Sequence, residues 1–303
     1  MINERYLELG LTALGRTGEK PGWFGGHYGA AVLAAYYLDR DIDLPEHVRT
    51  GIQNMADHLI AASPELFVPY DGEQADPALL ERILNGLRAN TARLSHSGHG
   101  NAYGFLALRA LLERPDMLLP SVVNGFYNCL IASSEGPGNR YYGIEDYSRF
   151  TVDQVTAIPA YQDLDELAER ALEECRHIYP GQVIDGKKYH FTGEVEHGLT
   201  HAQALIEYDR LGFPELTEAG LPNHRIQMQL NRTVPVDHEQ VRGTEIVVPP
   251  FTSIFAPEYW GRTYNDPHCL KVPYAALFLL QRLPEAKRAE AEYNVCKILG
   301  QMN

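Results

Sequence analysis

Four stretches of this chain share one pattern of apolar and polar positions. Each opens on a histidine, continues with small and apolar residues on every side of a predicted helix, and closes on a proline followed by an acid. A helix that is apolar all round is typical of one buried between other layers of a protein. We therefore expect four buried inner helices, each with a histidine in its first turn. The opening histidines are His27, His99, His197 and His268, and the closing pairs are Pro45-Glu46, Pro115-Asp116, Pro214-Glu215 and Pro284-Glu285.

The Pro-acid pairs predict where a second helix begins in each stretch. Proline is favoured in the first turn of a helix, where its missing N–H would have no partner, and an acidic side chain there faces the positive end of the helix dipole. Each stretch is therefore a predicted helical hairpin, made of an inner helix, a short corner and an amphipathic outer helix. The outer helices are expected at about 45–62, 116–133, 214–230 and 285–301, and further helices at 4–14, 75–94 and 163–177.

The spacing of the hairpins indicates a repeated architecture. Successive opening histidines are 72, 98 and 71 residues apart, so the two halves match and the middle carries an insertion, expected at about 135–195. Within it, Asp185-Gly186 between two short β-like runs predicts a small hairpin. We expect an all-α fold in which residues 1–303 form one domain, an α/α toroid of helical hairpins with this β-hairpin insertion. The four histidines would then lie at one end of the ring and line a shared cavity.

Composition narrows the range of partners and compartments. A net charge of −14 disfavours nucleic acid and anionic membranes, because both select clustered Lys and Arg. The longest apolar run, 29–38, is too short to span a bilayer, and the N-terminus lacks the basic-then-apolar pattern of a secretory signal. The cysteines form no Cys-x-x-Cys pair, which favours reduced thiols and a cytoplasmic protein. They are Cys129, Cys175, Cys269 and Cys296.

The candidate catalytic residues are histidines with a lysine and a tyrosine nearby. The ordinary imidazole pKa lies near neutrality, so His27, His99 and His268 suit proton transfer. Lys271 lies one turn after His268, where a buried ammonium would stabilise negative charge on a substrate, and Tyr264 belongs to the tyrosines that precede this helix. Taken singly, each histidine is more simply explained as a helix-start or core residue. Their common position in four repeats is what favours a site.

The densest group of possible metal ligands lies in the third repeat. His197 and His201 are four residues apart and share one helix face, so both could bind one divalent transition metal, with Glu194 or Glu196 as a third ligand or a base. The motif is not His-Glu-x-x-His, which excludes that metalloprotease signature. Metal-free acid–base chemistry is the alternative for the same residues.

Other cofactor and hydrolase signatures are missing from the chain. There is no Gly-x-Gly-x-x-Gly segment between a predicted strand and a helix, so a nucleotide cofactor is not indicated. Gly-x-Ser-x-Gly is also absent, which disfavours a serine hydrolase of that type. A metal is thus the one cofactor that the sequence suggests.

Two of the inner-helix starts resemble those of a known group of helical toroids. Ser97-Gly98-His99-Gly100 and Glu196-His197-Gly198 look like the His-Gly helix starts of lanthionine-cyclase-like α/α toroids. The Trp-Cys and Cys-His-Gly signatures of that family's zinc site are absent here, so the resemblance implies the fold and not the zinc chemistry.

The order of motifs along the whole chain resembles the questin-oxidase-like family. That resemblance implies a helical oxygenase that acts on polycyclic aromatic ketones, and it assigns no catalytic residue. The matching pieces are Gly26-His27, the Ser-His-x-Gly-His segment at 95–99, Thr200-His201-Ala202 and Asp266-x-His268-x-Leu270-Lys271.

The sequence therefore favours an enzyme that acts on a small, partly hydrophobic molecule, such as an aromatic compound or a ketone, in a central histidine-rich pocket. Oxidation is the first choice of reaction, on the resemblance alone. A metal-assisted lyase, isomerase or cyclase is the second choice, and a non-catalytic ligand-binding toroid is the third. The expected partner is the small-molecule substrate, and the sequence does not indicate an oligomeric state.

Overall fold

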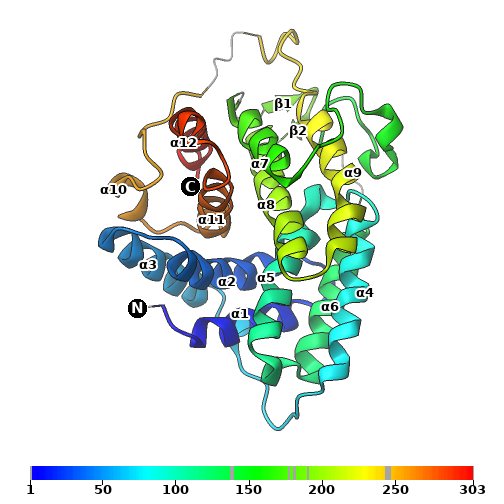
Figure 1. Cartoon of the computed structure of the whole chain (residues 1–303), viewed down its shortest axis with the longest axis vertical. Coiled ribbons are helices and arrows are strands. Elements are labelled where there is room, and N and C mark those ends of the chain that lie inside the picture. Colours follow the sequence, from blue (N-terminus) through cyan, green and yellow to red (C-terminus); the bar gives the residue numbers. More distant parts are fainter. Residues whose placement is uncertain are drawn as a thin grey trace.

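A computed structural model describes residues 2–136, 140–176, 178–179, 182–189, 191–242 and 247–302 of the chain. In this part the protein is mostly helical, with one small two-stranded antiparallel sheet (Figure 1). The all-α expectation is therefore confirmed. Among the described residues, no helix combines the length and the apolar character needed to cross a membrane.

Four helices form the centre of the molecule, and each contains one of the opening histidines near its N-terminal end. α2 packs against α5, α5 against α8, α8 against α11, and α11 against α2. Their side chains are buried along almost their whole length, as the all-round apolar pattern predicted. The four are α2 (Gly26–Asp41), α5 (His99–Glu113), α8 (Phe191–Arg210) and α11 (His268–Leu280).

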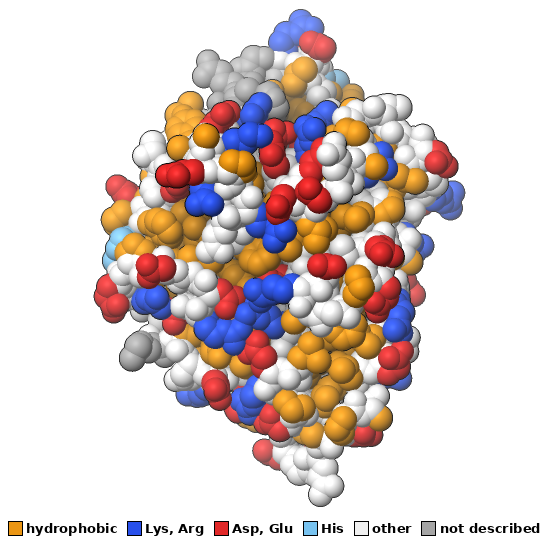
Figure 2. All heavy atoms as spheres, in the orientation of Figure 1, with side chains coloured by type: hydrophobic (Ala, Val, Ile, Leu, Met, Phe, Trp, Pro, Cys, Tyr) orange, Lys and Arg blue, Asp and Glu red, His pale blue; other side chains and the backbone are white. Residues whose placement is uncertain are grey.

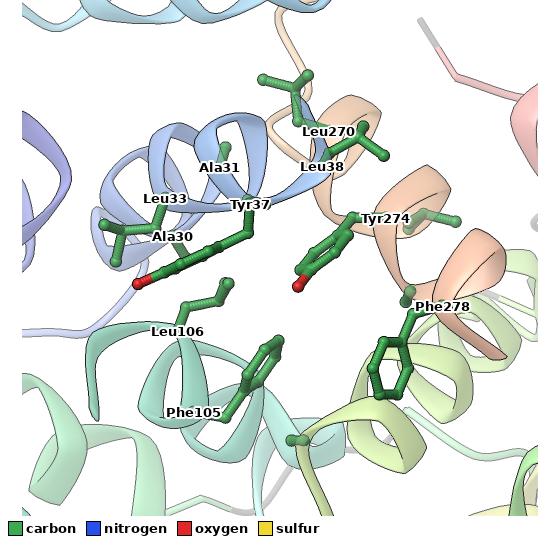
Figure 3. Packing of buried hydrophobic residues seen from close by; sticks show 14 of the residues in the cluster. Ala30, Ala31, Leu33, Tyr37, Leu38, Phe105, Leu106, Leu270, Tyr274 and Phe278 are labelled. Atoms are coloured by element: carbon green, nitrogen blue, oxygen red, sulfur yellow. The ribbon is translucent and has the colours of Figure 1, made fainter. Parts of the chain in front are cut away.

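Aromatic and aliphatic side chains fill the space between these inner helices. Figure 3 shows Tyr37 of α2, Phe105 and Leu106 of α5, and Tyr274 of α11 gathered there. Because several helices bury side chains into one cluster, their relative positions are held by packing, which fixes where their N-terminal ends meet.

The outer helices begin at or next to the predicted prolines, with one exception. Pro45 and Pro284 precede the first helical residue and Pro214 occupies it, but Pro115 opens only a short 3₁₀ turn. The second outer helix starts at Pro120 instead, because a residue before proline avoids the helical region, and Leu119 has φ −79° and ψ 141°. The outer helices are α3 (Glu46–Ala62), α6 (Pro120–Ser134), α9 (Pro214–Asn231) and α12 (Glu285–Leu299).

The remaining helices cover the inner ones from outside. α1 packs on α2 and α6, α4 packs on α6 and α5, and α7 packs on α8. These helices are α1 (Arg5–Thr17), α4 (Leu80–Thr91), α7 (Leu164–Glu173) and the short α10 (Pro257–Trp260). Short 3₁₀ segments lie at Pro64–Phe67, Pro77–Leu79, His96–Gly98, Pro115–Met117, Tyr147–Arg149, Val152–Gln154 and Glu174–Arg176.

The predicted β-hairpin is present in the middle of the chain. β1 (Gln182–Ile184) pairs antiparallel with β2 (Lys187–Tyr189). The intervening Asp185 and Gly186 have φ values of 50° and 79°, the left-handed pair that a two-residue hairpin loop requires. The hairpin leads into α8, whose start at Phe191 places Glu194 and Glu196 inside the helix. Residues 245–248 also read as a strand in the sequence, and this run falls partly outside the described residues.

The surface carries charges of both signs. Figure 2 shows Lys and Arg side chains interspersed with Asp and Glu on the face of Figure 1, together with exposed apolar areas.

Candidate functional site

The four opening histidines lie together: His27, His99 and His268 are in the first turn of their helices, whereas His197 is in the second turn of α8, which begins earlier than expected. Their rings form a closed cycle: the centroids of His27 and His99 are 4.7 Å apart, those of His99 and His197 4.1 Å, those of His197 and His268 5.0 Å, and those of His268 and His27 4.8 Å. The histidines occupy the same position in the four repeats, and the sequence therefore predicted that they lie together. At these separations the rings contact one another directly, rather than standing apart around an open lumen.

An oxygen atom lies beside the Nδ1 atom of each of these rings. The carbonyl oxygen of Phe24 is 2.7 Å from His27 Nδ1, and the carbonyl oxygen of His96 accepts a hydrogen bond from His99 Nδ1. A carbonyl oxygen only accepts, so Nδ1 carries the hydrogen in both rings and Nε2 has the lone pair; in His27 the Tyr103 hydroxyl lies 3.2 Å from that Nε2.

Carboxylates take the same position in the other two rings. The Asp266 carboxylate accepts from His268 Nδ1 at 2.7 Å, and Glu194 Oε2 lies 3.8 Å from His197 Nδ1. The Nε2 atoms of His197 and His268 are only 3.1 Å apart. The arrangement thus brings two ring nitrogens together while their Nδ1 sides face acceptors.

Burial keeps these imidazoles neutral. Removal from water lowers the pKa of His27, His99 and His197, in the first two well below the usual range. For His268, burial and the Lys271 charge lower the pKa to about 3, although the Asp266 carboxylate opposes this. A neutral imidazole is the form that binds metal ions, so the rings are ready for this role at pH 7.

Two buried glutamates of α8 have pKa values shifted in opposite directions. Burial alone would raise the pKa of Glu194, but Arg140, whose Nη1 lies 3.4 Å from Glu194 Oε1, lowers it together with His197 and Ser97 to about 2. Glu194 is therefore a carboxylate. Burial and the nearby charge of Asp266 raise the pKa of Glu196 well above its usual value, and Glu196 Oε1 lies 3.8 Å from His268 Nδ1.

Two groups of described residues could hold a metal ion. In each group the potential ligand atoms all lie within 4.8 Å of one another. One group is His27, His99 and His268, and the other is Glu196, His197 and His268.

The expected ligand set of Glu194, His197 and His201 is not among these groups. His201 is fully buried, with Nδ1 2.8 Å from Gln227 Oε1 and Nε2 3.1 Å from Asn101 Nδ2. Helical spacing placed His201 and His197 on one face correctly, but side chains of α5 and α9 occupy both nitrogens of His201. Glu196 belongs to a possible ligand group in place of Glu194.

Lys271 lies beside the histidines, as expected, and Tyr264 does not. The Lys271 charge lowers the pKa of His27 and His268, and its Nζ is 5.4 Å from the centre of the Tyr103 ring. The Tyr264 hydroxyl donates to the carbonyl oxygen of Tyr259 at 3.1 Å, which makes it part of the loop before α11. Tyr103 is the tyrosine of the cluster, since its hydroxyl lies 2.5 Å from His27 Nδ1.

Trp23 is a further part of the site that the sequence did not point out. Its ring lies 4.6 Å from that of His99, 4.5 Å from that of His96 and 5.6 Å from that of His27. Its place four residues before His27 was the available signal.

The turn before His99 requires glycine at position 98. Gly98 has φ 82°, and a Cβ there would lie 2.9 Å from His201 Nδ1.

No protein-family model matches this chain, and neither the comparison with curated proteins nor that with solved structures gives a match.

Proposed function

We propose that the four-histidine cluster is the metal centre of an enzyme that oxidises a small, partly hydrophobic molecule. The observation that carries this proposal is the common orientation of the rings. Histidines that bind metals nearly always direct their other ring nitrogen at a carboxylate or a carbonyl oxygen, which fixes the tautomer and the ring. His27, His99 and His268 have such an acceptor at Nδ1, and Glu194 lies on that side of His197.

The separation of two ring nitrogens supports a shared ion. Two nitrogens bound at about 2.1 Å to one ion lie about 3.0 Å apart in a right-angled arrangement and about 3.4 Å apart in a tetrahedral one. The Nε2 atoms of His197 and His268 are 3.1 Å apart.

The ligand types support a transition metal. Imidazole suits zinc, copper, iron and nickel, and two histidines with one carboxylate are the ligand set of non-haem iron(II) oxygenases. Glu196, His197 and His268 have this composition. In such a reaction dioxygen is the oxidant. The resemblance of the motif order to questin-oxidase-like proteins supports the same reaction class.

A metal-assisted lyase, isomerase or cyclase is the second candidate. It is favoured by the other group, His27, His99 and His268, because three imidazoles form the typical catalytic site of zinc, which has no redox chemistry. In both cases we infer that the four hairpins form an α/α toroid, which the cyclic packing of α2, α5, α8 and α11 supports.

The test is the metal content of protein purified without a histidine tag and reconstituted without oxygen with Fe²⁺, Zn²⁺ or Cu²⁺. We expect about one ion per chain in the parent and a loss of affinity of at least tenfold in His268→Ala. His201→Gln, a change to another buried histidine of α8, should keep the ion. A parent that binds none of the three ions, or a His268→Ala variant that binds as tightly as the parent, would refute the metal centre. Oxygen consumption with candidate substrates then separates the oxidase from the lyase.

A further inference from the structure

Lys271 of α11 is a buried lysine, and the described residues place no counter-ion in contact with it. Its side chain is 3% exposed, and among the residues that the structure describes nothing accepts a hydrogen bond from its Nζ or forms an ion pair with it. Its Nζ lies over the face of the Tyr103 ring, 5.4 Å from the ring centre. A buried charge is normally paired, because taking it out of water is costly.

A second lysine shows the ordinary arrangement. Lys297 of α12 is 8% exposed, and its Nζ donates to the carbonyl oxygen of Arg176 at 2.9 Å. The fold can therefore provide an acceptor for a buried lysine. At Lys271 it provides none among the described residues, and this ammonium lies next to the proposed metal ligands.

The acids near Lys271 are engaged by other groups of the site. Asp266 and Glu196 are the acids whose charges act on it, but Asp266 bonds to His268, and Glu196 belongs to a possible ligand group. A divalent ion on the histidines would add further positive charge beside the ammonium. An anionic ligand at this point would balance both charges.

Aromatic side chains pack on the histidines of the cluster. The Phe24 ring is 63% exposed and lies 4.5 Å from the ring of His27, and the half-buried Trp23 packs on His99. An exposed aromatic ring beside buried polar groups is a typical contact for the apolar part of a ligand.

We infer that the substrate carries an anionic oxygen, a carboxylate or a phenolate, on a planar apolar group, and that Lys271 binds this oxygen. Calling this ligand a substrate rests on the proposed function, but its binding to Lys271 does not require the metal. A charge-assisted hydrogen bond from the ammonium selects the anion over a neutral molecule of the same shape. Trp23 and Phe24 contact the planar part.

Benzoate and benzamide are the probes, because they share a shape and differ in charge. Binding is measured by calorimetry, with both the metal-free and the Zn²⁺-loaded protein. We expect the metal-free parent to bind benzoate about tenfold or more tighter than benzamide. Lys271→Met should lower the affinity for benzoate to that for benzamide. Lys297→Met is the matched control and should leave both affinities unchanged. Trp23→Ala should lower the affinities for benzoate and benzamide by the same factor.

Stability gives an independent readout. Lys271→Met removes an unpaired charge and keeps the length of the side chain, so its thermal midpoint should equal or exceed that of the parent. A lower midpoint would show Lys271 to be structural and overturn the inference. Equal binding of the two probes by the parent, or tight benzoate binding by Lys271→Met, would also overturn it. These results do not depend on a bound metal. If the metal-centre proposal is wrong, the measured metal content of the protein shows that separately.

Discussion

The Asp266 carboxylate accepts two hydrogen bonds from His268, one from the backbone N–H at 2.9 Å and one from Nδ1 at 2.7 Å. The first satisfies a backbone N–H in the first turn of α11, and the second sets the tautomer of the ring. One side chain therefore anchors the helix end and directs His268 Nε2 toward His197. Asp266 therefore lies on the Nδ1 side of His268, away from the Nε2 atom that faces His197.

Asp266→Asn is predicted to weaken metal binding about tenfold to a hundredfold, since loss of such an acceptor reduces the basicity and the order of the ligand ring. The amide oxygen still accepts from the backbone N–H, so the helix end should persist. Competition with a chelator measures the affinity. The control is Asp163→Asn, which alters a capping carboxylate at the start of α7. Equal losses in the two variants would contradict the role given to Asp266.

Metal binding is predicted to quench the fluorescence of Trp23. The chain has two tryptophans, and Trp23 packs on His99, whereas Trp260 is buried with its Nε1 donating to the carbonyl oxygen of Ile254. Addition of Cu²⁺ or Fe²⁺ to the metal-free protein should reduce the emission of the parent. In Trp23→Phe the remaining emission of Trp260 should not respond. A response of equal size in that variant would place the ion away from the histidines.

Arg109→Met is predicted to cost about 3 kcal/mol or more of unfolding free energy, because it removes the buried guanidinium that contacts both oxygens of the largely buried Asp41 carboxylate. The Arg109 guanidinium contacts Asp41 at 2.6 and 2.9 Å and the Tyr274 hydroxyl at 2.9 Å, toward the opposite ends of α2 and α5 from the histidines. Urea denaturation gives the loss.

The matched control is Arg40→Met. Arg40 also contacts Asp41, but its side chain is 37% exposed, so the expected loss is about 1 kcal/mol or less. Neither change should alter metal affinity. A loss for Arg40→Met as large as that for Arg109→Met would contradict the role of burial.

The stability of the metal-free protein is predicted to fall as the pH drops below about 6.5, the usual histidine pKa. Burial lowers the pKa of His201 to about 4 and that of His224 to about 3, so the unfolded chain takes up protons first. Their contribution is complete above about pH 6.5 and is lost toward the folded-state values, at about 1.4 kcal/mol per pH unit for each group.

The variant His224→Gln isolates one of these groups. His224 contacts the Tyr161 hydroxyl and the carbonyl oxygen of Gly198, and glutamine does not titrate. Urea denaturation at pH 7, 6 and 5 should give a slope lower by about 1.4 kcal/mol per pH unit than that of the parent. An unchanged slope would contradict a neutral, buried His224.

Local patterns along the sequence determined the helices and the phase of the four opening histidines. Continuous apolar stretches require burial, and prolines followed by acids start helices by local sterics and charge, so these features could be predicted without knowledge of the neighbours. The β-hairpin was equally local, because Asp185-Gly186 suits a left-handed two-residue turn.

Only the tertiary structure decided which polar groups face the cluster. Helix spacing could not distinguish His201 from the other histidines, since its partners Asn101 and Gln227 come from other helices. Tyr103 replaces Tyr264 because packing of α2 on α5 brings its hydroxyl to His27. The order of residues sets which side chains share a helix face, but the contacts between faces depend on how helices distant in the chain pack together.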